Sequence, residues 1–243
     1  MSSVDRFLKR VSQAAIHLSG QFIRWPNAND KLAIRNCFED KGGFPGVIGL
    51  IDGTHIRIRA PEDDPDAYIN RKKFFSLNVQ VVCDNNMVFP DVLAGWPGSV
   101  HDSRVLCNSE LFRTAVNKFP GDTHHLGDGG YPLLRWLITP YRENGHLTRQ
   151  QRRFNAVLSS LRQKVERAIG LLKGRWRKLL FLDHIDLQLA VHLVIAACVH
   201  DDFYDGYIDD DDGFGDDDPH DAGRQLDERA ERKRTHLMNT ICT

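Results

Sequence analysis

The sequence lacks an apolar run long enough to cross a membrane, and it lacks the start of a secreted protein. No stretch approaches the roughly 18 uncharged apolar residues that a membrane-spanning helix needs. The first ten residues do not show the basic-then-apolar order of a signal peptide. We therefore expect a soluble, intracellular protein.

Cysteine is scarce and scattered. Five cysteines are spread over 243 residues, and none of them forms a Cys-x-x-Cys pair. An odd number of cysteines argues against a disulfide framework, and the lack of close pairs argues against a structural zinc site. The hydrophobic content of 41% is enough for a full core, so one large domain is the natural expectation at this length.

The net charge of -1 hides a strong asymmetry along the chain. Residues 201–221 carry eleven Asp and no Lys or Arg, whereas residues 1–200 carry 27 bases against 19 acids, a formal charge of +8. A basic body predicts a polyanionic partner such as nucleic acid, although solvated surface charges are the simpler alternative. We expect 201–243 to be an acidic, disordered tail. Its basic cluster at Arg229–Arg234 is either a nuclear import signal or a chance cluster.

The hydrophobic periodicity predicts an α/β domain with helices before it. Residues 1–43 should form a helical segment with two short helices, and 44–200 the main domain. Within that domain the pattern predicts strands at 44–59, 76–83, 87–94 and 124–127, and helices at 99–116, 154–180 and 186–199. The first three strands resemble an antiparallel meander. This order predicts a mixed sheet flanked by helices, and it is the order of the ribonuclease-H-like fold.

Three acids stand where such a fold would bring them together. Asp52 ends the apolar run of the first strand, Asp128 follows the fourth strand, and Glu166 lies in the long helix. At about 100° per residue, Glu166 falls roughly 120° from Phe154, at the margin of the buried ridge. The alternative for Glu166 is an ordinary i,i+4 ion pair with Arg162.

Three converging carboxylates predict a site for Mg²⁺ or Mn²⁺, because these ions prefer oxygen ligands. Two such ions can hydrolyse a phosphodiester bond, with Asp52 as the expected bridging ligand and Asp128 and Glu166 completing the site. Asp102, at the start of the predicted 99–116 helix, is either a helix cap or an auxiliary ligand. The basic side chains that could contact a DNA backbone are Arg57, Arg104, Arg162 and Lys173.

The motifs around these acids resemble those of a known family. They read Gly-Leu-Ile-Asp52-Gly-Thr-His, Ala-Gly-Trp-Pro-Gly-Ser-Val-His-Asp102-Ser-Arg, Gly-Asp128-Gly-Gly-Tyr-Pro-Leu and Val-Glu166-Arg-Ala-Ile-Gly-Leu-Leu-Lys-Gly-Arg-Trp. In this order they resemble transposases of the PIF/Harbinger superfamily and the Harbinger transposase-derived nucleases. The resemblance covers about residues 20–200. It implies a ribonuclease-H-like DDE nuclease with Asp52, Asp128 and Glu166 as catalytic metal ligands and Asp102 as a further potential ligand.

The resemblance also implies how the protein works and where. It implies a transposase-derived, divalent-metal-dependent DNA endonuclease in the nucleus, with the cytoplasm as a second location and a Myb-like DNA-binding protein as partner. The DNA-binding region usual at the N-terminus of the family is largely missing, and Ser159 stands where a related bacterial signature has tyrosine. The alternatives are a catalytically silent DNA- or protein-binding domain, and a phosphatase or RNase with the same metal chemistry.

Overall fold

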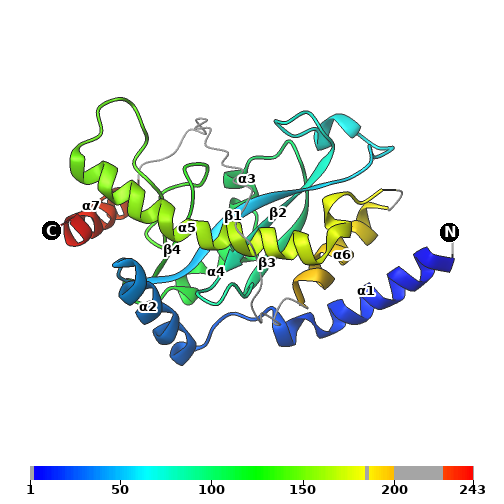
Figure 1. Cartoon of the computed structure of the whole chain (residues 1–243), viewed down its shortest axis with the longest axis horizontal. Coiled ribbons are helices and arrows are strands. Elements are labelled where there is room, and N and C mark those ends of the chain that lie inside the picture. Colours follow the sequence, from blue (N-terminus) through cyan, green and yellow to red (C-terminus); the bar gives the residue numbers. More distant parts are fainter. Residues whose placement is uncertain (1–2, 184–185, 200–226, 243) are drawn as a thin grey trace.

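The architecture is a mixed five-stranded sheet between two layers of helices (Figure 1). The computed structural model describes residues 3–183, 186–199 and 227–242. The strand order is β3-β2-β1-β4-β5. The strands are β1 (Val47–Arg57), β2 (Ser76–Cys83), β3 (Asp91–Pro97), β4 (His124–Leu126) and β5 (Leu137–Ile138). The α/β, ribonuclease-H-like class that the sequence predicted is confirmed.

The first three strands form the predicted antiparallel meander. β1 is at one edge of this meander and in the middle of the five-stranded sheet. β1 pairs antiparallel with β2 and parallel with β4, so it joins the two halves of the sheet. It continues past its acid to Arg57 without a break. The third strand begins at Asp91 rather than at residue 87, because the Asp84 carboxylate accepts bonds from the backbone N–H groups of Asn86 and Val88 and widens the turn.

Helices cover both faces of the sheet. In Figure 1 the long helix α5 crosses in front of the sheet with α2 and α7 near its first half, while α3 and α4 lie behind. Helix α1 packs on α6 and extends away from the body. The helices are α1 (Ser3–Phe22), α2 (Ala28–Gly42), α3 (Asp102–Cys107), α4 (Glu110–Lys118), α5 (Arg149–Arg175), α6 (Leu187–Val199) and α7 (Glu228–Cys242), with short 3-10 turns η1 (Pro65–Tyr68) and η2 (Arg177–Leu180).

The alternation of β1 divides the hydrophobic core in two. Leu50 faces the α5 side and Ile51 faces the α3 and α4 side, as successive strand residues must. On α5 the predicted ridge is buried at Phe154, Leu158, Val165, Ala168 and Leu172. Each of these side chains except Ala168 contributes about 1.5–3 kcal/mol when it is fully buried. This packing fixes the rotation of α5 against the sheet, and therefore the direction of its polar side chains.

Two helix boundaries differ from the predicted ones because of capping. The predicted helix at 99–116 is two helices, since the Ser109 hydroxyl accepts a bond from the Phe112 N–H at 3.0 Å and starts α4. Helix α5 begins at Arg149 rather than at residue 154, because Thr148 and Gln151 form a reciprocal capping box. Strand β5 lies in a region for which the sequence predicted no strand.

The prediction of a disordered tail over 201–243 is wrong for residues 227–242, which form α7 and pack on α5. Arg234 is buried, donates to the carbonyl of Pro140 and lies 4.0 Å from the ring centre of Tyr141. Part of the cluster at 229–234 thus serves packing. Residues 200–226, which hold the Asp-rich stretch, lie outside the described residues. Among the helices that the structure describes, none is long and apolar enough to cross a membrane.

Candidate active site

Asp52 and Asp128 come together because their strands are parallel neighbours in the sheet. Leu50 of β1 pairs with Leu126 of β4, and each acid lies two residues beyond that pair. The Asp52 side chain keeps 14% of its surface exposed and accepts a bond from the Gly53 N–H at 2.9 Å. Asp128, in the loop after β4, accepts one from the Gly130 N–H at 2.9 Å. Backbone groups therefore orient both carboxylates before any ligand binds.

Asp102 reaches the same end of β1 from the α3 side. Its carboxylate accepts a bond from the Asn78 amide of β2 at 2.9 Å. It lies directly over the Cα of Gly53, where the Cβ of any other residue would collide with it. His101 is the N-cap residue of α3, and the helix has no side-chain capping bond. Asp102 lies in the first turn of α3 without a capping hydrogen bond, and its charge acts on Asp52.

Helix α5 adds a cation and a fourth acid. The Arg162 guanidinium lies 3.2 Å from Asp52 Oδ1 and 3.8 Å from Glu166 Oε1. The Arg162 side chain is 11% exposed, whereas that of Glu166 is 51% exposed. The predicted i,i+4 pair between Arg162 and Glu166 is present, yet the same guanidinium also links this helix to β1. Glu166 thus stands at the solvent side of the cluster.

The carboxylates are poorly solvated and repel one another. Burial raises the pKa of Asp52 to about 7, the nearby Arg162 lowers it in part, and Asp128 and Asp102 raise it further. Burial also raises the pKa of Asp102 and that of Asp128. One guanidinium therefore neutralises only part of the negative charge of the cluster, and additional positive charge would be stabilised here.

The donor set fits a hard divalent cation. Within the described part of the chain, no group of three or more His, Cys, Asp or Glu side chains is arranged to hold a metal ion. The groups that converge are all oxygen donors, which suits Mg²⁺ or Mn²⁺ better than zinc. Asp52 and Asp128 would hold such an ion, with Asp102 and Glu166 as further ligands on either side.

Sequence reasoning missed the buried polar residues on the α3 side of the sheet. Asn78 and Gln80 of β2 alternate with apolar residues and would ordinarily face solvent, yet both are buried. The amide of Gln80 and the hydroxyl of Tyr131 have no hydrogen-bond partner among the described residues. Burial and the neighbouring acids, Asp102 first, raise the pKa of Tyr131. The available signal was the position of Tyr131, three residues after Asp128 in the same motif.

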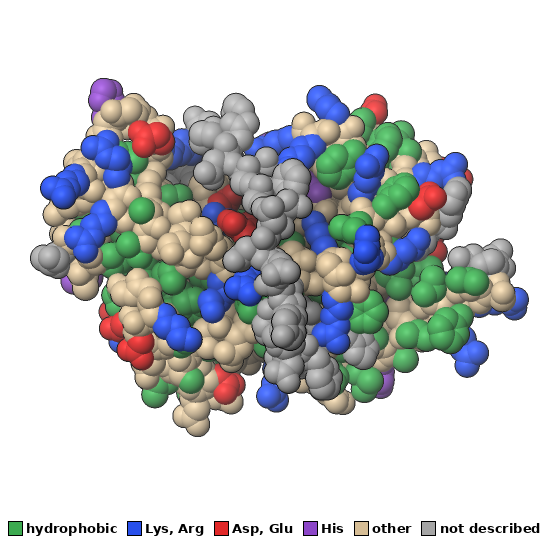
Figure 2. All heavy atoms as spheres, viewed as in Figure 1, with side chains coloured by type: hydrophobic (Ala, Val, Ile, Leu, Met, Phe, Trp, Pro, Cys, Tyr) green, Lys and Arg blue, Asp and Glu red, His purple; other side chains and the backbone are tan. Residues whose placement is uncertain are grey.

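The four predicted DNA-contacting residues fall into two groups. Arg162 lies inside the acid cluster, and Lys173 donates to Thr54 Oγ1 at 2.7 Å and to a β1 carbonyl at 3.1 Å. Arg57 and Arg104 are exposed, and Arg57 lies between two aromatic rings. Figure 2 shows acidic side chains recessed in the middle of one face with Lys and Arg side chains on both sides. Only the exposed pair is placed to meet a large substrate at the surface.

Comparison with known protein families matches residues 51–200 to the DDE superfamily endonucleases. The matched region contains all four acids. The chain belongs to the DDE superfamily endonucleases. The curated relatives point to the Harbinger-derived branch of this family and so confirm the resemblance to Harbinger-derived nucleases.

"Putative nuclease HARBI1" of Rattus norvegicus is 33% identical over 209 residues, which cover 82% of this chain and 57% of the relative. "Protein ALP1-like" of Arabidopsis thaliana is 35% identical over 187 residues, covering 71% of this chain and 44% of the relative. The chain therefore spans about half the length of the curated relatives it matches. No solved structure matches. The assignment of the DDE domain therefore depends on the family match, and the placement of its acids depends on the geometry described above.

Proposed function

We propose that this DDE domain is a divalent-metal-dependent DNA endonuclease that hydrolyses phosphodiester bonds. Asp52, Asp128 and Glu166 would be the catalytic metal ligands, with Asp102 as a further ligand. The observation that supports this most is the convergence of carboxylates from β1, the loop after β4, α3 and α5 around the Arg162 guanidinium. A structural salt bridge would need one acid, not four.

The bound metal would supply an activated water and neutralise charge on the phosphate. The residues of the chain supply the geometry for that chemistry. Asn78 orients Asp102, and the Gly130 N–H orients Asp128. Lys173 bonds the last turns of α5 to β1, which fixes the position of Glu166 two turns earlier on the same helix. The proposed partners are DNA and a Myb-like DNA-binding protein, and the proposed location is the nucleus.

Plasmid nicking with Mg²⁺ or Mn²⁺ tests the proposal. We expect Asp52→Asn and Glu166→Gln to lower the nicking rate by at least about 100-fold, since loss of a metal ligand should cost no less than loss of an outer-shell partner. Asp40→Asn, the same change on the exposed face of α2, is the control and should nick like the wild type. Nicking that survives both site variants would refute the assigned chemistry.

Calorimetry separates the proposal from a catalytically silent binding domain. The proposed nuclease should bind Mn²⁺, and Asp52→Asn should weaken that binding while Asp40→Asn leaves it unchanged. A chain that binds no Mn²⁺ and whose DNA affinity is insensitive to EDTA would instead be a silent DNA-binding relative.

A further inference from the structure

A second charged hollow lies at the other end of the sheet, away from the acids. It has a volume of about 630 Å³ and lies between α7, α2 and the loops that lead into the parallel strands. Six basic side chains line it: Arg35, Arg135, Arg229, Arg232, Lys233 and His236. One acid, Asp122, is also in the lining. Lys and Arg side chains therefore outnumber acids in its lining by five to one.

The hollow is distinct from the active site. Its lining residues Gly46 and Asp122 lie just before β1 and β4, whereas Asp52 and Asp128 lie at or beyond the far ends of the paired segments. The five residue steps from Val47 to Asp52 span about 16 Å at strand spacing. The two sites thus lie at opposite ends of the segment along which β1 and β4 pair.

The floor of the hollow is held in place by Lys233. Its ammonium group donates to the backbone carbonyls of Asp122 at 2.7 Å and of Arg135 at 3.0 Å. These bonds attach α7 to the loops before β4 and β5. Burial lowers the pKa of Lys233 to about 8, and the nearby Asp122 carboxylate raises it in part. The basic wall that α7 presents is therefore fixed relative to the sheet.

The arginines of the wall differ in their partners. Arg232 pairs with Glu228 at 3.3 Å and Arg35 pairs with Glu39 at 3.6 Å. Arg135 and Arg229 are exposed, and the described residues offer neither of them an acidic partner. Exposed guanidinium groups in a concave, positive surface suit phosphate oxygens, which they bind in bidentate fashion.

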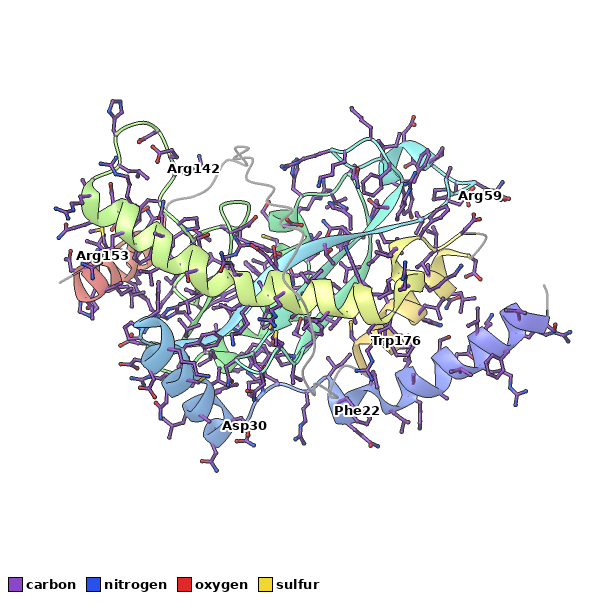
Figure 3. The ribbon with its side chains drawn as sticks, viewed as in Figure 1. Phe22, Asp30, Arg59, Arg142, Arg153 and Trp176 are labelled. Carbon is purple, nitrogen blue, oxygen red and sulfur yellow. The ribbon has the colours of Figure 1, made fainter. Side chains whose placement is uncertain are left out.

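We propose that this hollow binds phosphates of a nucleic-acid backbone, as a second contact with DNA outside the active site. This inference rests on the proposed function in taking DNA as the substrate. Figure 3 shows further basic side chains at the same end of the molecule, Arg153 on the first turns of α5 and Arg142 on the preceding loop. A duplex that reaches both sites would be held about five base pairs from the bond to be cut, at about 3.4 Å per step.

The test compares two double variants that lose the same charge. Arg135→Gln/Arg229→Gln removes the two arginines of the wall for which the described residues offer no acidic partner, and Arg6→Gln/Arg10→Gln removes two exposed arginines of α1. DNA affinity is measured by fluorescence anisotropy with a labelled 20-base-pair duplex in EDTA, so that no cleavage occurs. Thermal melting should be unchanged in both variants, because all four side chains are exposed.

We expect the first variant to lose affinity and to reduce the slope of log K against log[salt] by about 1.8, the value for two phosphate contacts. Affinity and slope equal to those of the α1 variant would overturn the inference. So would a hollow that binds pyrophosphate in calorimetry while the duplex affinity stays that of the control. Plasmid nicking distinguishes a failure of this inference from a failure of the proposed function. If the wild type nicks DNA in a metal-dependent way and Asp52→Asn abolishes nicking, the proposed function stands even where the inference about the hollow fails.

Discussion

The buried charge of Asp52 should govern how the metal-free protein responds to pH. Burial raises its pKa from 3.8 to about 7 in the folded state. This difference corresponds to about 4 kcal/mol as an upper bound. Between pH 4 and pH 7 the folded state keeps a proton that the unfolded state has released. The stabilisation is therefore fully present below about pH 4 and is lost as the pH rises through about 7, at about 1.4 kcal/mol per pH unit.

Asp52→Asn removes this titration and keeps the shape of the side chain. In urea unfolding with EDTA, the variant should gain about 2 kcal/mol over the wild type between pH 5 and pH 7. The charges of Asp102 and Asp128 contribute to the raised pKa of Asp52, and loss of its charge eases their ionisation in turn. That coupling changes the size of the gain but not its sign. Asp40→Asn on the surface of α2 provides the matched control and should follow the wild-type profile.

Stability profiles of Asp52→Asn and wild type that run parallel from pH 5 to pH 7 would refute the reasoning. A difference that shrinks as the pH rises would refute it more strongly, since it would mean that Asp52 is stabilised by its charge. Mn²⁺ offers an internal check. Mn²⁺ that binds only the folded state should stabilise the wild type near pH 7 and should stabilise Asp52→Asn far less.

Two further predictions concern the residues that position the cluster. Gly53→Ala places a methyl group against the Asp102 carboxylate, so it should destabilise the fold by about 1–3 kcal/mol and weaken Mn²⁺ binding; unchanged calorimetry and urea midpoints would contradict this. Burial lowers the pKa of Lys173 to about 8, so stability should rise with pH above that value. Between pH 8 and pH 10 the wild type should gain about 2 kcal/mol relative to Lys173→Met in urea unfolding, and identical profiles would count against it.

The sequence predicts those helices and strands whose hydrophobic pattern extends over many residues. The eight alternating residues of β2 and the apolar ridge of α5 are both confirmed. The parts it misses depend on single contacts: Ser109 divides one predicted helix into two, and the two residues of β5 are too few to show a period. Helix α7 was missed for another reason. The acidic stretch before it dominates the local composition, while the contacts that order it come from α5 and Tyr141.

The candidate site was predictable to the extent that chain order determines it. Residues at matching positions of adjacent parallel strands must meet, so Asp52 and Asp128 could be placed from the order of elements alone. Asp102 could not, because the same position serves a helix cap and a ligand equally well in sequence. In the structure, Asn78 holds the Asp102 carboxylate toward Gly53, and α3 has no side-chain capping bond. From sequence alone, a polar residue in an alternating strand is assigned to the solvent-facing side, because the helix that covers that face is not known.

Because of Arg162, the acid cluster can be stable without a metal and still be suited to one. Its guanidinium contacts Asp52 and lies near Glu166, so the folded chain is not left with several buried anions and no cation. The compensation is incomplete, because the pKa of Asp52 remains raised to about 7. A fully paired carboxylate would instead have a pKa below its ordinary value. The remaining negative charge is what would attract a divalent ion. In the proposed nuclease, the same arginine would therefore stabilise the empty fold while leaving enough uncompensated charge for the metal.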